Sequence, residues 1–444
     1  MMHLFLNCLA ASAGAGLTYV RNVIPHLASR TDLRATVLLA PALRAEFGTL
    51  PNVSFVEMET AKNSVKRFWQ EQRLLPGFIR HSGADVLIST GNFALRNSPI
   101  PQILLSGNSL YTSEDFSRDV RSRGDYGLWL DTRIKGFFAK QSLRWADCTV
   151  APSSAFAEEL RRWSGAATTV AIHHGFDRAI FLQEQASLPE EVQSKLDSGK
   201  DALRLLFVSH YNYYRNFETL LRAIQLLREH LSGQKIRLYL TCKFRSEENP
   251  GSYHAEATAA LVQELGISEE VVELGSIPYR SLYQVYKACD LYVTAAYAET
   301  FAHPVVEAMA SGLPVIASDI AAHHEICGQA AMYFSRFSAE ELALRIVQVA
   351  RSDSLRRQLA ECGSVRSQDF SWEKHVGEVV DLARKLEIFR QLTSHCLAWQ
   401  SDDKMLFECF HSTANDGQRL DSEQLLPPAS RPSIPRDQLR TLHS

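Results

Sequence analysis

Two glutamates frame the segment best suited to bind a ligand, Glu299-Thr-Phe-Ala-His-Pro-Val-Val-Glu307. The apolar run 291–294 before it predicts a buried strand, and Pro304 predicts the start of a helix, because proline is tolerated in the first helical turn. A helix N-terminus offers unpaired N–H groups and a partial positive charge, which suit a phosphate. We therefore expect an anion site here, with Glu299 in the loop and Glu307 in the first turn, each able to accept hydrogen bonds from hydroxyl groups. The structural alternative is a capped helix with an acidic first turn.

A second candidate, Ser209-His210-Tyr-Asn-Tyr-Tyr-Arg215-Asn216, follows the apolar run that begins at residue 203. Arg215 is a permanent cation whose fork of donors suits a diphosphate. His210, at the end of the predicted strand, can add a second donor, charged or neutral according to its pKa. The alternative is a tyrosine-rich loop in which Arg215 pairs locally, and for His210 taken alone we prefer this structural role.

A third candidate is the small-residue loop at 11–16, which contains Gly14 and Gly16 and follows the first apolar run. Such a loop lets the backbone approach a ligand closely. It lacks the third glycine of the dinucleotide-binding fingerprint and the acidic residue that reads the ribose, so an ordinary strand-to-helix turn explains it equally well. The histidines lack the spacing of a metal site, and we expect no bound metal but structural or ligand-contacting roles for His173, His174, His303, His323 and His324.

Short apolar runs alternate with longer amphipathic stretches along most of the chain, which predicts parallel sheets covered by helices. A polar stretch at 183–202 interrupts the alternation, which restarts at residue 203. A cleft between two such domains, at the C-terminal ends of their strands, is a natural ligand site. We therefore expect a first domain over 1–182, a linker over 183–202, a second domain over 203–370, C-terminal helices over 371–410 and a mobile Ser/Pro/Gln-rich tail over 411–444.

The composition narrows the class of protein. The chain has 444 residues, 45% hydrophobic and 22% charged, with 47 Lys and Arg against 50 Asp and Glu and a net charge of -3. That balance argues against broad nucleic-acid binding. The eight cysteines are scattered singly, which indicates a reduced cytosolic compartment. No apolar run approaches the roughly 20 residues that span a bilayer. We expect a cytoplasmic protein, with peripheral association at the inner face of the cytoplasmic membrane as the alternative.

Several of these segments, in this order, resemble the retaining glycosyltransferases of the GT-B fold, family 4 type. Glu299–Glu307 is similar to the E-x7-E element of that family, and the run 308–319 to its EAMA-x-G-x-P-V-x-A-S run. His174-Gly-Phe-Asp177 resembles the N-G-V-D stretch that closes the first domain. Phe370-Ser-Trp372 resembles the F-S-W element that begins the C-terminal helix.

The similarity extends over roughly residues 1–385 and is strongest over 203–335. It implies an α/β protein with two Rossmann-like domains facing across a cleft, and a C-terminal helix that packs back on the first domain. It also implies transfer of a hexosyl unit, of mannosyl or glucosyl type, from a nucleotide-diphosphate sugar to a saccharide or lipid-linked acceptor in cell-surface polysaccharide or glycolipid synthesis. The nucleotide sugar is then a donor substrate, and the family needs no cofactor and no obligatory metal.

The resemblance further implies a role for each candidate residue. Glu299 would hold hydroxyl groups of the transferred sugar, and Arg215 and His210 would neutralise the leaving diphosphate. Asn108 lies where the family places a polar active-site residue, and Glu307 would bind the ribose hydroxyls. The other contacts to the donor would come from Phe301, Ala302, His303, Gly14, Gly16, Gly275 and Ile277.

The chain also departs from the family pattern. The family usually has Gly-Arg in place of Ser209-His210, Lys in place of Arg215, and Gly in place of Thr300 and Ala302. Such changes fit a specialised subgroup or an altered active site. The alternatives that remain are a sugar-nucleotide epimerase or a sugar phosphorylase of the same fold, a non-catalytic nucleotide-sugar-binding protein and, least favoured, a Rossmann dehydrogenase.

Overall fold

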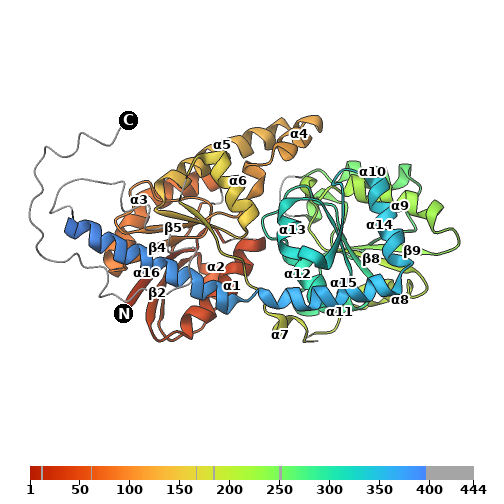
Figure 1. The fold of residues 1–444 in the computed structure, drawn as a ribbon. Helices are drawn as coiled ribbons and strands as arrows, with labels where there is room; N and C mark the ends of the chain where they lie inside the picture. Colours follow the sequence, from red (N-terminus) through yellow and green to blue (C-terminus); the bar gives the residue numbers. More distant parts are fainter. Residues whose placement is uncertain (12–13, 62, 167, 184–185, 250–252, 397–444) are drawn as a thin grey trace, which may run out of the picture. The chain divides into compact units, whose positions relative to one another are not determined.

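A computed structural model of the chain describes residues 1–11, 14–61, 63–166, 168–183, 186–249 and 253–396. Residues Met1–Phe389 form one compact unit, which contains two parallel sheets (Figure 1). The predicted tail at 411–444 lies outside the described residues, as does the end of the expected C-terminal helices. No helix in the described part of the chain is both long enough and apolar enough to cross a bilayer.

The first domain holds a seven-stranded sheet in the order β3-β2-β1-β4-β5-β6-β7. Its strands are β1 (Met2–Asn7), β2 (Leu33–Leu39), β3 (Val53–Glu57), β4 (Val86–Ser89), β5 (Gln102–Leu105), β6 (Cys148–Ala151) and β7 (Thr169–Ala171). Its helices are α1 (Gly14–Ala28), α2 (Pro41–Arg44), α3 (Ser64–Ser82), α4 (Glu114–Ser122), α5 (Tyr126–Trp145) and α6 (Ser154–Ser164). The strand order reverses between β1 and β4, which creates a crevice at the C-terminal ends of these two strands.

The second domain repeats this plan with six strands in the order β10-β9-β8-β11-β12-β13. Its strands are β8 (Leu203–Phe207), β9 (Ile236–Leu240), β10 (Val271–Glu273), β11 (Leu291–Thr294), β12 (Val315–Ser318) and β13 (Ala331–Phe334). Its helices are α9 (Phe217–His230), α10 (Glu256–Glu264), α11 (Tyr279–Lys287), α12 (His303–Ala310), α13 (Ala321–Cys327), α14 (Ala339–Ala350) and α15 (Asp353–Arg366). Here the order reverses between β8 and β11.

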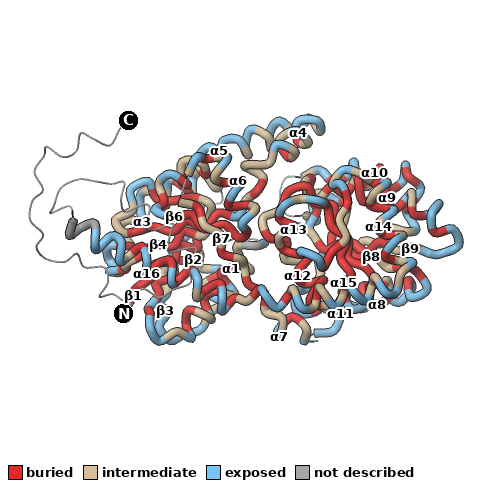
Figure 2. Tube along the Cα trace, in the orientation of Figure 1, coloured by how far each residue is buried: buried red, intermediate tan, exposed pale blue. Residues whose placement is uncertain are grey.

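The central strands are buried along their whole length, as the apolar runs predicted. Every residue of β4, β5, β6, β11 and β12 is buried, and the strands form the red interior of each domain in Figure 2. Strands covered on both faces need apolar side chains on both faces, so they read as continuous apolar runs. The two-domain α/β architecture expected from the sequence is confirmed.

The expected linker at 183–202 contains a helix, which the sequence analysis missed. Helix α7 (Arg178–Phe181) is followed by α8 (Glu190–Asp197). Val192 and Leu196 of α8 are buried in the same apolar core as Leu206 of the second sheet. Residues 190–197 therefore pack against the second sheet, because two apolar side chains four residues apart anchor this polar segment.

The last helix, α16 (Trp372–Cys396), returns to the first domain and crosses its sheet (Figure 1). Its buried residues Trp372, Val376 and Val380 share one apolar core with Leu4 of β1 and Ile24 of α1. The return of the C-terminal helix, expected from the resemblance, is confirmed. Because this helix follows the second domain in sequence, its packing ties the two domains together.

Gly175 is the point where the first domain leaves no room for a side chain beside α16. A Cβ atom at Gly175 would overlap the backbone nitrogen and Cα of Trp372. We predict that Gly175→Ala lowers the midpoint of thermal unfolding, because overpacking costs about 1–3 kcal/mol. The control is Gly377→Ala in α16, where the added Cβ meets no atom within 4 Å and a helical alanine is favourable. Equal midpoints for both variants would contradict this packing.

Candidate functional site

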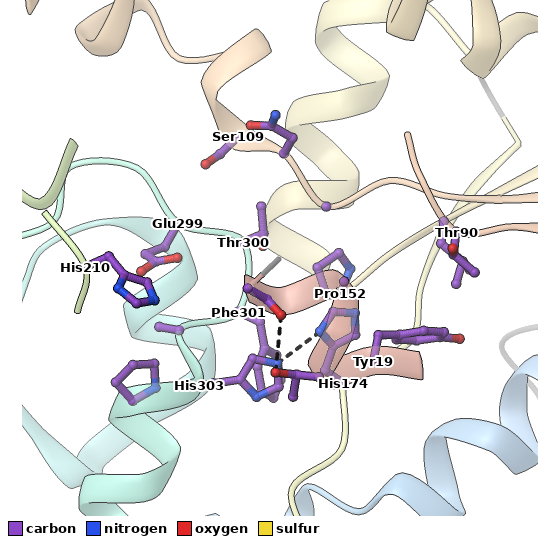
Figure 3. A pocket seen from close by; sticks show the side chains of 18 of the residues that line it. Tyr19, Thr90, Ser109, Pro152, His174, His210, Glu299, Thr300, Phe301 and His303 are labelled. Carbon is purple, nitrogen blue, oxygen red and sulfur yellow. Dashed lines mark hydrogen bonds between the residues drawn. The ribbon is translucent and has the colours of Figure 1, made fainter. Parts of the chain in front are cut away.

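A cavity of about 660 Å³ lies at the reversal points of both sheets. Most of its wall comes from the segments that follow β1, β4 and β5 in the first domain and β8 and β11 in the second, and further residues come from α3, from the segments after β7 and β10, and from α16. Figure 3 shows Thr90 and Ser109 of the first domain across from His210 and Glu299 of the second. The cavity wall contains nearly all the predicted site residues, namely Glu299, Arg215, His210, Asn108, Glu307, Phe301, Ala302, His303, Gly14, Gly16 and Ile277. Gly275 is not part of the wall, although its neighbour Ser276 is.

Arg215 and Glu299 form an ion pair at the cavity wall. Both side chains are nearly buried, with exposed fractions of 15% and 11%. Burial alone would lower the pKa of Arg215, but Glu299, together with Tyr214 and Tyr292, raises it above its ordinary value. The guanidinium also lies 4.9 Å from the ring centroid of Tyr214, and its buried Nε has no hydrogen-bond partner. A buried donor without a partner is unfavourable, so this edge of Arg215 suits an anionic ligand.

Helix α12 begins at the cavity wall with unusual backbone geometry. Ala302, the N-cap residue, has φ 65° and ψ 61°, in the left-handed region that favours glycine, and no side chain caps the helix. A non-glycine residue in this conformation costs about 1–2 kcal/mol. The strain occurs where the chain turns sharply from the loop after β11 into α12. Pro304 has no N–H, and the N–H of Val305 donates to the carbonyl oxygen of Ala302. The first turn of α12 therefore offers the N–H of His303 at the cavity.

Glu307 is the fifth residue of α12 and lies in its second turn, so the prediction of a first-turn position was wrong. The helix begins one residue before Pro304, which occupies the second helical position. Glu307 is buried and accepts a 2.8 Å hydrogen bond from the hydroxyl group of Tyr286. Burial raises the pKa of the Glu307 carboxyl to about 7. Near neutral pH this group can therefore both accept and donate hydrogen bonds.

His210 lies at the wall beside Arg215. Partial burial and the charge of Arg215 lower the pKa of its imidazole, so His210 is neutral at pH 7. A neutral imidazole attracts an anion less strongly than the arginine that the resemblance leads one to expect at this position. Arg215 is therefore the main cation at this part of the wall.

Small and polar residues shape the opposite wall. Gly14, with φ 53°, and Gly16 lie in the first turn of α1 and not in a loop, which corrects the sequence analysis. The side-chain oxygen of Asn108 accepts a 3.1 Å hydrogen bond from the N–H of Leu110 and so caps the short helix after it. The sequence analysis missed Gly91, where a Cβ atom would overlap that of Ala10. The absence of a Cβ atom at Gly91 permits the close approach of the segments that follow β1 and β4.

A cluster of histidines and aromatic rings closes the cavity between the domains. His174 Nδ1 lies 3.3 Å from His303 Nε2, as drawn in Figure 3. His375 Nδ1 lies 2.8 Å from the carbonyl oxygen of His173, so Nδ1 carries a proton, and Nε2 is 3.1 Å from the hydroxyl oxygen of Tyr19. The sequence analysis gave no role to His375 or Tyr19, because they are 356 residues apart.

Burial keeps this cluster uncharged. It lowers the pKa of His303 and of His375 to about 4 each, and the pKa of His174 falls well below its ordinary value through burial and its histidine neighbours. Protonation of any of these rings would place an uncompensated charge in a buried site. The cluster therefore packs as neutral rings at physiological pH.

Other polar contacts bridge the two domains. Glu325 of α13 accepts hydrogen bonds of 2.7 Å each from the N–H groups of Ser154 and Ala155 at the start of α6. Its Oε1 is also 2.7 Å from His173 Nε2. Burial alone would raise the pKa of Glu325, but these hydrogen bonds lower it to about 2. A second bridge joins Arg123 to Glu218 at 2.6 Å.

The buried histidines predict a pH dependence of stability. Because the folded pKa of His375 is about 4 and the ordinary value is 6.5, the folded state binds fewer protons than the unfolded chain between these pH values. Stability is therefore lost as pH falls through this window, by at most about 1.4 kcal/mol per pH unit for each histidine.

We predict that His375→Gln makes the midpoint of thermal unfolding fall less steeply than in the wild type between pH 6.5 and pH 4. Contributions from other groups, including the opposite one from Glu307, are common to both proteins. The control is His81→Gln at an exposed histidine of α3, which should follow the wild-type slope. A constant difference between His375→Gln and wild type at every pH would contradict the neutral, buried state of this ring.

Comparison with known proteins agrees with this arrangement. Residues 190–365 match the family "Glycosyl transferases group 1". A D-inositol 3-phosphate glycosyltransferase from Corynebacterium aurimucosum is 26% identical over 207 residues, which cover 46% of this chain and 48% of the relative. The O-antigen chain mannosyltransferase B of Escherichia coli is 27% identical over 113 residues, 26% of this chain and 30% of the relative. The alignments thus span about half the length of these curated relatives or less.

Solved structures share the fold over a larger part of the chain. Sucrose-phosphate synthase from Thermosynechococcus elongatus superposes with a TM-score of 0.68 at 19% identity, covering 87% of this chain and 99% of that structure. Anabaena HepE in complex with UDP-glucose superposes with a TM-score of 0.64 at 16% identity, covering 87% and 100%. The chain therefore has the GT-B fold, and its residues 190–365 are similar to the group 1 glycosyl transferases.

Proposed function

We propose that this protein transfers a hexosyl unit, of mannosyl or glucosyl type, from a nucleotide-diphosphate sugar to a saccharide or lipid-linked acceptor. The observation that carries the proposal is the wall of the second domain. There, Arg215 with its unpaired Nε, the uncapped start of α12 and the buried carboxyl of Glu307 all line one cavity. Cationic donors suit a diphosphate, and a buried carboxyl group beyond them suits the hydroxyl groups of a ribose.

In the proposed reaction, Arg215 exchanges its partner Glu299 for the diphosphate of the donor. In the structure Glu299 compensates the charge of Arg215. A bound diphosphate offers Arg215 stronger, bidentate acceptors. Glu299 is then free to accept hydrogen bonds from hydroxyl groups of the sugar. Arg215 meets negative charge that grows as the nucleoside diphosphate leaves, which is where electrostatic stabilisation lowers a barrier most.

The acceptor enters from the first domain, whose wall faces the donor across the cavity. In the proposed retaining reaction the acceptor hydroxyl attacks the anomeric carbon on the same face of the sugar from which the diphosphate departs. A diphosphate oxygen takes the hydroxyl proton as the new glycosidic bond forms. The protein contributes position and charge stabilisation. In this proposal the donor is a substrate, and neither a cofactor nor a metal takes part.

The relatives support the class of donor and acceptor. Mannosyl transfer appears in the name of one relative, and one structural neighbour was solved with UDP-glucose. Another relative's name contains a phosphorylated inositol. We place the reaction in cell-surface polysaccharide or glycolipid synthesis, in the cytoplasm, with the inner face of the cytoplasmic membrane as the place where a lipid-linked acceptor would be met.

Substitutions of Glu307 and Glu299 should affect nucleotide binding and sugar transfer differently. We predict that Glu307→Ala weakens nucleoside diphosphate binding about 10- to 100-fold, because it removes a buried hydrogen-bonding partner. Glu299→Ala should instead keep or tighten this binding, since it frees Arg215, but should lower the rate of transfer at least about 100-fold. Binding is measured by thermal shift against nucleotides and nucleotide sugars, and transfer by release of nucleoside diphosphate. The matched control is Glu264→Ala at an exposed position of α10.

Several outcomes would contradict the proposal. Failure of every nucleotide and nucleotide sugar to bind would remove the donor site. Consumption of a nucleotide sugar without any acceptor would favour an epimerase, and a requirement for inorganic phosphate would favour a phosphorylase. Binding without turnover on a broad set of acceptors would favour a non-catalytic binding protein. Negligible effects of both glutamate variants would contradict the assigned residues.

A further inference from the structure

Arg67 contributes charge to the wall opposite the proposed donor site. Among the described residues of the first domain that line the cavity, it is the one arginine, and no lysine, aspartate or glutamate accompanies it. It is the fourth residue of α3, and only 12% of its side chain is exposed. The first-domain wall therefore carries a positive charge of its own.

The partner of Arg67 compensates this charge poorly. Glu71, one turn further along α3, has its Oε1 3.3 Å from Arg67 Nε, but the geometry is not that of a hydrogen bond, and this buried Nε has no hydrogen-bond partner. Glu71 is itself buried, and its other oxygen accepts a 2.9 Å hydrogen bond from Asn7 Nδ2. Burial raises the pKa of the Glu71 carboxyl, and Asn7 and Arg67 oppose this rise.

The groups around Arg67 on this wall are neutral and polar. Asn108 and Tyr111 line the cavity with Ser64, the first residue of α3. Burial raises the pKa of the Tyr111 hydroxyl group to about 12, and the charge of Arg67 opposes this rise. The hydroxyl group of Tyr111 is therefore close to Arg67. Such side chains can bind the hydroxyl groups of a polyol or sugar beside an anion held by the arginine.

The cavity thus holds two separate cations on its two domains. Arg215 belongs to the second domain and is already paired with Glu299. Arg67 belongs to the first domain, where the proposed function places the acceptor. One diphosphate suits the second-domain wall, so an under-compensated arginine on the facing wall fits a second anion.

Resting on the proposed function, we propose that the acceptor carries a phosphoryl group and that Arg67 binds it, while Asn108 and Tyr111 contact the acceptor's hydroxyl groups. The planar fork of arginine matches the oxygens of a phosphate. Two sources share this chemistry, namely a phosphorylated sugar or polyol and the diphosphate of a lipid-linked saccharide. Both place a phosphoryl group on the first-domain side of the cavity.

A purely structural Arg67 would only hold Glu71 and, through it, Asn7 of β1. The two roles differ in what they predict for Glu71. If Arg67 binds an anion, Glu71 competes with that anion, and Glu71→Gln keeps or strengthens binding. If Arg67 only stabilises the buried contacts of Glu71 with Asn7, Arg67→Met and Glu71→Gln lower the stability of the fold by similar amounts. Neither variant then changes anion binding selectively.

The experiment measures binding by titration calorimetry while the donor site is saturated with the nucleoside diphosphate that binds best. The probes are glucose 6-phosphate against glucose, and farnesyl diphosphate against farnesol in detergent. We expect the phosphorylated member of one pair to bind at least about 10-fold more tightly to the wild type. Arg67→Met should abolish this difference, Arg67→Lys should restore part of it, and Glu71→Gln should keep or increase it. The control is Arg73→Met at an exposed arginine of the same helix.

The preferred probe identifies the source, since glucose 6-phosphate indicates a small acceptor and farnesyl diphosphate a lipid-linked one. Unchanged nucleoside diphosphate affinity in Arg67→Met shows that this variant is folded and that its donor site is intact. Equal affinity of the wild type for both members of each pair, or equal loss in Arg67→Met and Glu71→Gln, would overturn the inference alone. Absence of nucleoside diphosphate binding to the wild type would overturn the proposed function as well.

Discussion

The buried ion pair between Arg215 and Glu299 is the interaction around which the cavity is organised. Each residue follows a different strand, β8 or β11, and these strands are neighbours in the second sheet. Breaking a buried pair by removing one partner leaves an uncompensated charge and typically costs about 3–5 kcal/mol. The pair therefore fixes the two loops against each other, and through the loop after Glu299 it sets the position at which α12 begins.

The pair and the closing cluster act on different walls of the same cavity. In the second domain, Glu299 balances the charge of Arg215, and a bound anion would take the place of Glu299 as the partner of Arg215. Between the domains, neutral rings such as His303 and Trp372 pack closely, while Glu325 caps α6 across the interface. The cavity is thus closed by groups that stay uncharged or fully paired near neutral pH. The charges that remain available to a ligand are those at the two facing walls.

The sequence was informative where structure depends on local pattern. The apolar run 291–294 coincides with the buried strand β11. Glu299 and Arg215, chosen from the pattern around them, line the cavity, as does Asn108, which the resemblance supplied. Helix α8 was missed because only two of its side chains are buried. The pairing of Arg215 with Glu299 was missed too, because a contact between residues 84 apart depends on strand order, which the pattern of a single strand does not reveal.

The central claim is that the wall with Arg215 binds a diphosphate. Titration calorimetry of the wild type and of Arg215→Met with a nucleoside and with its diphosphate tests this most directly. We predict that the wild type binds the diphosphate at least about 10-fold more tightly than the nucleoside, because charge-assisted hydrogen bonds are stronger than neutral ones, and that most of this preference is lost in Arg215→Met. Equal affinity of the wild type for nucleoside and diphosphate, or an unchanged preference in the variant, would contradict the claim.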